Sequence, residues 1–71
     1  MSNLYITVKT EFEKYFDEHP DFPQDLYEVL MEHIEITELS GCAWSIQGYN
    51  DRFVFDAPEC TTAIYNVSDF V

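Results

Sequence analysis

The stretch His19-Pro20-Asp21-Phe22-Pro23 divides the first half of the chain into two segments that are both expected to be helical. A residue that precedes proline is disfavoured in helical geometry, so Pro20 is expected to end the first helix. Pro23 fits the first turn of a second helix, because the backbone N–H that proline lacks has no partner there in any case. Asp21 is the expected N-cap residue. Helices joined by so short a connection are expected to pack as an antiparallel hairpin.

The segment before this break admits two interpretations over residues 4–8. Apolar side chains recur at three- and four-residue steps, which favours one helix that starts near residue 4. These side chains are Tyr5, Val8, Phe12, Tyr15 and Phe16. Residues 4–8 are also rich in β-forming side chains and alternate in polarity, so a short strand is the alternative.

The segment after the break carries the apolar stripe of a second helix. Leu26, Leu30 and Ile34 recur at four-residue steps, and this helix is expected to reach Glu35. From residue 36 the polarity alternates, first over 36–39 and then in longer runs.

Three of these runs, with turn residues between them, predict successive strands of an antiparallel meander; the runs are residues 42–47, 53–55 and 61–67. The sequence therefore predicts one α+β domain over residues 1–71. Its N-terminal helical hairpin, about residues 4–35, packs on a small antiparallel sheet of three to four strands, about residues 36–68.

The composition combines a folded core with a strong negative charge. The chain has 71 residues, with 14 Asp or Glu against 3 Lys or Arg, and its net charge is −11. Hydrophobic residues make up 46% and aromatic residues 17%, which is too apolar for a disordered acidic tail. Such a charge excludes direct binding of nucleic acid through a basic surface and attraction to anionic membranes. No run approaches the ~20 apolar residues that a membrane-spanning helix needs.

The N-terminus and the cysteines indicate a cytoplasmic protein. The first four residues contain neither a basic region nor an apolar run, so no signal peptide is expected. If the protein is viral, its location is the cytoplasm of the host cell. Cys42 and Cys60 could form a disulfide if they lie on neighbouring strands. In a reducing cytoplasm, two buried free thiols are the preferred interpretation.

The negative charge is concentrated in residues 11–38, where ten acidic residues face one lysine, for a net charge of −9. On the second helix four acidic residues follow one another at steps of three, four and three, and these steps place them on one helix face. They are Asp25, Glu28, Glu32 and Glu35, with no Lys or Arg between them. An ordinary solvent-exposed face is the simpler explanation. The alternative is a binding surface for a basic partner, in which this stripe is surrounded by Glu13, Asp17, Asp21 and Glu38.

Carboxylates spaced about 5–6 Å apart along a helix imitate a row of phosphates, which lie about 3.4 Å apart along each strand of B-DNA. In size and composition the chain resembles the small acidic DNA-mimic inhibitors that phages use against restriction enzymes, CRISPR effectors and uracil-DNA glycosylase. The resemblance implies carboxylates displayed on helices or strands, and a few apolar residues that anchor the contact. Phe22 and Tyr49 are the expected anchors, because aromatic residues dominate binding hot spots. Trp44, Phe53 and Phe55 are expected in the core.

The expected function is that of a phage-encoded inhibitor which blocks a basic DNA- or RNA-binding host protein by imitating the nucleic-acid backbone. Immunity proteins and antitoxins that cap basic nucleases fit the same resemblance. A different alternative is a small interaction or regulatory module that binds a partner, or a second copy of itself, through an apolar sheet face. The chain is therefore expected to be a monomer or a homodimer.

Catalytic and metal-binding patterns are not evident in the sequence. His33 follows Glu28 and Glu32 on one helix, but a metal site needs ligands that converge from several directions. His33 is expected to interact with the C-terminal end of its helix instead. Only two glycines occur, so there is no glycine-rich phosphate loop. We therefore expect no enzymatic activity, no cofactor and no metal.

Overall fold

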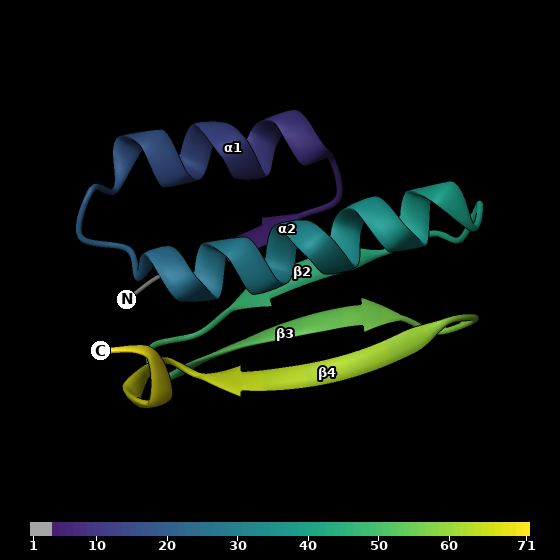
Figure 1. The fold of residues 1–71 in the computed structure, drawn as a ribbon. Coiled ribbons are helices and arrows are strands. Elements are labelled where there is room, and N and C mark those ends of the chain that lie inside the picture. Colours follow the sequence, from purple (N-terminus) through teal and green to yellow (C-terminus); the bar gives the residue numbers. More distant parts are fainter. Residues whose placement is uncertain (1–3) are drawn as a thin grey trace.

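Two helices pack against one face of a four-stranded antiparallel sheet in the computed structural model, which describes residues 4–71. The elements follow one another as β1 (Leu4–Ile6), α1 (Lys9–Glu18), α2 (Gln24–Leu39), β2 (Ser45–Gly48), β3 (Arg52–Ala57), β4 (Thr61–Asn66) and the short 3-10 helix η1 (Val67–Phe70). The strands are ordered β1-β2-β3-β4, each antiparallel to its neighbour. This arrangement confirms the predicted α+β fold. The helices form an antiparallel pair, α1 contacting β1 and α2 contacting β3 (Figure 1).

Residues 4–6 form a strand, so the prediction of a helix from residue 4 is wrong. Leu4, Tyr5 and Ile6 pair with Gly48, Gln47 and Ile46 of β2. Pairing with β2 selects the strand, in which Ile6 is buried on the helix side while Tyr5 points to the opposite face and is 65% exposed. Helix α1 therefore starts at Lys9, with Val8 as its N-cap residue.

Helix α2 is longer than predicted and is capped differently. It continues past Glu35 to Leu39, because Thr37 is only 1% exposed and extends the buried stripe of Leu26, Leu30 and Ile34. The alternation over 36–39 is therefore helical, and the prediction that the β half starts at residue 36 is wrong. Gly41 ends the helix with a positive φ of 77°. At the other end Pro23, in an extended conformation, is the N-cap residue in place of Asp21.

The core lies between the helices and the inner face of the sheet. Its fully buried residues come from every layer: Phe12 of α1, Leu26, Leu30 and Ile34 of α2, Ile46 of β2, and Phe55 and Ala57 of β3. Trp44 and Phe53 are also buried, as predicted, although Trp44 lies in the loop before β2 rather than within a strand. Phe12 and Phe55 each contribute a large apolar surface, which small domains need because their cores are thin.

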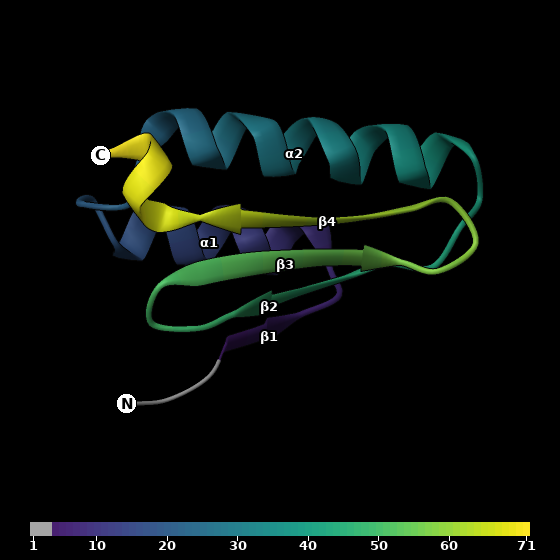
Figure 2. The ribbon, with the colours of Figure 1, turned by 90° about the horizontal axis from the view of Figure 1, so that it is seen from below.

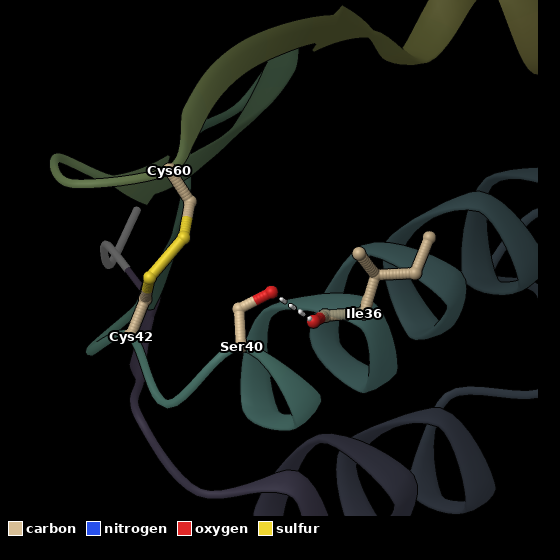
Figure 3. Close-up of a disulfide and its surroundings, with 4 residues drawn as sticks. All are labelled: Ile36, Ser40, Cys42 and Cys60. Atoms are coloured by element: carbon tan, nitrogen blue, oxygen red, sulfur yellow. Dashed lines mark hydrogen bonds between the residues drawn. A yellow bond between two sulfur atoms is a disulfide. The ribbon is translucent and has the colours of Figure 1, made fainter.

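Cys42 and Cys60 form a disulfide, so the preferred prediction of two buried free thiols is wrong (Figure 3). Cys42 is half-buried in the loop after α2, and Cys60 is exposed in the turn between β3 and β4. Both segments reach the same end of the molecule, and the bridge joins the C-terminal end of α2 to the far end of the sheet. Beside it, the Ser40 hydroxyl donates a hydrogen bond of 3.1 Å to the backbone oxygen of Ile36.

The surroundings of Gly48 leave no room for a side chain, so a larger residue there is expected to destabilise the fold. A Cβ atom at this buried position would lie 2.7 Å from a ring carbon of Phe53 and 3.1 Å from the Cβ of Leu4. Gly48→Ala is therefore expected to lower the free energy of unfolding by about 1–3 kcal/mol, because the Phe53 ring must shift. Urea denaturation measures this loss. An unchanged denaturation midpoint would show that β1 and β3 do not approach Gly48 this closely.

Candidate protein-binding surface

The four acidic residues predicted to form a stripe are all exposed on α2; they are Asp25, Glu28, Glu32 and Glu35. At about 100° per residue they fall within an arc of about 80°. This arc lies opposite the buried stripe that Leu26, Leu30, Ile34 and Thr37 form on the same helix. The carboxylates therefore project away from the core along α2 from Asp25 to Glu35.

One cation reaches this stripe from α1, which the sequence spacing did not predict. Lys9 Nζ lies 3.2 Å from a carboxylate oxygen of Glu35, although the two residues are 26 positions apart. The hydrogen bond and the charge of Glu35, followed by the charges of Glu13 and Glu38, raise the pKa of Lys9. The antiparallel packing brings the start of α1 beside the end of α2 and so causes this pair. Because both side chains are exposed to solvent, the pair contributes little stability.

The acidic surface extends from α2 onto α1. Of the four surrounding residues, Glu13 is half-buried, and Asp17, Asp21 and Glu38 are exposed. Burial first, and then the charges of Glu13 and Asp17, raise the pKa of Tyr27 on α2. Tyr27 stacks on Phe16 of α1 with ring centroids 3.9 Å apart. The carboxylates that act on its hydroxyl come from both helices, since Glu35 of α2 contributes as well. Glu38 is held differently, because it accepts a hydrogen bond of 3.3 Å from Trp44 Nε1.

These raised pKa values predict a loss of stability above about pH 10. The unfolded chain releases the protons of Tyr27 and Tyr15 more easily than the folded protein does, since burial raises the pKa of both. The raised pKa of Lys9 acts in the same direction. At alkaline pH the folded state therefore binds more protons, and stability falls as the pH rises through the unfolded-state values. Urea denaturation at pH 8 and pH 11 measures the loss.

Tyr27→Phe is expected to reduce this pH dependence, because the variant has no phenol to ionise. Tyr5→Phe is the matched control, since Tyr5 is exposed on the opposite face of the sheet. Equal pH dependence in Tyr27→Phe and the unmodified protein would contradict the contribution assigned to Tyr27.

Of the two predicted apolar anchors, only Tyr49 is at the surface. Phe22 is 9% exposed and belongs to the core, so the prediction of an exposed Phe22 is wrong, although Phe22 lines a cavity at the end of the molecule opposite the disulfide. The turn between its two flanking prolines directs the ring inward, where it packs edge-on against Phe53 and Tyr15. The ring centroids lie 5.2 Å and 5.8 Å away, respectively. Tyr49 is half-buried in the turn after β2, and the guanidinium of Arg52 lies 4.5 Å from its ring centroid.

The sheet offers a second candidate surface on the face turned away from the helices (Figure 2). The pairing register aligns Tyr5, Gln47, Val54 and Ile64 in one row across the four strands. Tyr5 is 65% and Ile64 is 62% exposed, and no other element within residues 4–71 covers this row. The two faces of the molecule therefore differ: one carries carboxylates, and the other carries an uncharged, partly apolar row.

The two histidines have structural partners. His33 Nε2 lies 2.6 Å from the hydroxyl of Tyr65 on β4, rather than at the C-terminal end of its helix as predicted. His19 Nδ1 lies 2.9 Å from the backbone oxygen of Tyr15, one turn earlier in α1. Across the described part of the chain, no three His, Cys, Asp or Glu side chains are grouped so that they could hold a metal ion.

Comparisons of the chain with protein-family models, with curated proteins and with solved structures found no match. Between residues 4 and 71 there is no helix whose length and apolar character would let it cross a membrane.

Proposed function

We propose that this protein is a small acidic inhibitor, of the kind that phages encode, which occupies the phosphate-binding surface of a basic DNA- or RNA-binding protein. The observation that carries this proposal is the exposed stripe of Asp25, Glu28, Glu32 and Glu35, opposite the buried face of α2. Glu13 and Asp17 extend the same negative surface onto α1. Inhibition is by competition for the binding surface, without a catalytic step.

The charge distribution supports a partner with a basic surface. A net charge of −11 on 71 residues is costly for a small domain, because like charges on neighbouring helix positions repel one another. A basic partner relieves this repulsion, and opposite charge accelerates the encounter. Since counterions screen such contacts, the complex is expected to weaken as the salt concentration rises.

Capture from a bacterial lysate, followed by competition, tests the proposal. The immobilised protein is expected to retain a DNA- or RNA-binding protein, which duplex DNA or increasing salt then releases. The stripe variant Glu28→Lys with Glu32→Lys is expected to lose this partner. Glu59→Lys combined with Asp69→Lys is its matched control, because both residues are exposed and lie outside α1 and α2. A captured partner without a basic surface, or binding that salt does not affect, would refute the proposal.

We also propose that the inhibitor acts in the cytoplasm, which is that of the host cell if the protein is viral. Cytoplasmic glutathione and thioredoxin keep thiols reduced, so this location requires that the protein bind its partner with Cys42 and Cys60 reduced. Thiol labelling of protein taken directly from the producing cells shows whether Cys42 and Cys60 are reduced there and so tests the proposed location. Two labelled thiols support the cytoplasmic location, whereas an intact disulfide supports folding in an oxidising compartment.

The open sheet face favours a second candidate function, an interaction module or homodimer that associates through its outer face. The row of Tyr5, Val54 and Ile64 would supply the apolar contact, and face-to-face packing would keep the acidic helices of the two copies apart. Size-exclusion chromatography at low and high salt separates the two candidates. A dimer held by apolar contacts persists at high salt, whereas the complex of a phosphate mimic dissociates.

A further inference from the structure

A cavity of about 390 Å³ opens at the end of the molecule opposite the disulfide. Figure 1 shows the α1–α2 connection, the β2–β3 turn and η1 meeting at this end. The cavity floor is apolar, because Phe22 and Phe53 line it and pack edge-on against each other at 5.2 Å. Tyr15 and Tyr49 line it as well, while Asp21 and Asn50 provide polar groups.

We propose that this cavity receives an arginine side chain of the basic partner. The inference rests on the proposed function and specifies which partner group the aromatic residues contact. An arginine side chain has an apolar stem that suits the floor and a planar, weakly hydrated guanidinium that stacks on aromatic rings. A carboxylate such as Asp21 pairs with that guanidinium through charge-assisted hydrogen bonds.

The electrostatics of the cavity favour a cation over an anion. Burial first, and then the negative charge of Asp21, raise the pKa of Tyr15, so the Asp21 carboxylate acts on the Tyr15 hydroxyl inside the cavity lining. Helix α1 ends beside the cavity, and the C-terminal end of a helix carries partial negative charge. Its C-cap residue His19 also lines the cavity, stacks on Tyr15 and has Nδ1 2.9 Å from the backbone oxygen of Tyr15.

The ring of Tyr49 shows that this lining suits a guanidinium, because one of its faces already holds Arg52 of this protein. The guanidinium carbon of Arg52 lies 4.5 Å from the centroid of the Tyr49 ring. The charge of Arg52 is offset by Asp51, whose Oδ1 lies 3.0 Å from Arg52 Nη1. A lysine would also be attracted, but its compact, strongly hydrated ammonium gains less from a ring face than arginine does. The geometry therefore favours arginine over lysine.

NMR titration of the isolated protein tests the inference without the partner. The probe is N-acetyl-arginine methylamide, compared with the lysine analogue and with the citrulline analogue, which has the same shape without the charge. The arginine compound is expected to shift amide signals of residues 15–23 and 48–53 and to saturate at millimolar concentration. The lysine compound is expected to bind about 2- to 5-fold more weakly. The citrulline compound is expected to cause no shift there.

Three variants locate the site. Asp21→Asn and Tyr49→Leu are each expected to weaken arginine binding, whereas Glu59→Gln, which removes an equal charge in the exposed β3–β4 turn outside the cavity, is expected to leave it unchanged. Equal losses in Asp21→Asn and Glu59→Gln would show that arginine only follows the general negative field and would overturn the inference. Binding of the citrulline compound equal to that of arginine would overturn it too.

The outcomes also separate this inference from the proposed function. Arginine binding at the cavity without capture of any basic partner contradicts the proposed function alone. Capture of a basic partner through the α2 stripe, without arginine binding at the cavity, contradicts this inference alone.

Discussion

Replacing both cysteines, as Cys42→Ser with Cys60→Ser, is expected to lower the free energy of unfolding of the oxidised protein by about 3 kcal/mol. The disulfide spans a sequence separation of 18 residues. Closing a loop of that length lowers the conformational entropy of the unfolded chain, which stabilises the folded state by about 3 kcal/mol. For a domain of this size, such a loss lowers the melting temperature by about 12–24 °C. Thermal denaturation followed by circular dichroism measures the difference.

Reduction of the unmodified protein provides the control for this prediction. A reductant is expected to lower its melting temperature to that of the double serine variant and to leave the variant unchanged. A melting temperature that the reductant does not alter would show that the bridge contributes nothing to stability. Because small domains are stable by only about 5 kcal/mol, the predicted loss would leave the reduced protein with about 2 kcal/mol, so that it remains mainly folded, as the proposed action in the cytoplasm requires.

The sequence could predict the placement of the acidic stripe because the steps between residues on one helix determine the face they share. Asp25, Glu28, Glu32 and Glu35 needed only the assumption that residues 24–35 are helical. Lys9 could not be foreseen as the partner of Glu35, because their contact depends on how two separate helices pack. The spacing of Leu26, Leu30, Ile34 and Thr37 does predict a helix that continues past Glu35, since Thr37 lies on the same face.

Residues 4–6 and Phe22 show where local pattern is insufficient. The sequence over 4–8 fits both a helix and a strand, and the choice depends on pairing with Gln47 and Ile46, about forty positions away. Phe22 lies between two prolines in a connection, a setting typical of exposed residues. It is buried because aromatic rings of α1 and β3 pack around it. The disulfide has the same origin, as the approach of Cys42 to Cys60 follows from the fold rather than from their spacing.

Reversing two charges in the stripe, as Glu28→Lys with Glu32→Lys, is expected to weaken binding of the captured basic partner about 100-fold. Each reversal replaces an attraction by a repulsion at the interface, and about 1–2 kcal/mol for each position gives this factor. The fold is expected to remain intact or to gain up to about 1 kcal/mol. In the variant, Asp25 and Glu35 each face a lysine in place of a carboxylate, while the two new lysines repel each other.

Binding measured by calorimetry and unfolding measured in urea test the two parts of this prediction separately. The control variant, Glu59→Lys with Asp69→Lys, makes the same change in net charge outside α1 and α2 and is expected to bind the partner within a few-fold of the unmodified protein. If both variants weaken binding equally, the partner responds to the net charge of −11 and not to the face of α2. If the stripe variant binds as tightly as the unmodified protein while remaining folded, the stripe is an ordinary solvent-exposed face. A selective loss in the stripe variant would instead assign the partner's contact to the carboxylates of α2, because only their position distinguishes the two variants.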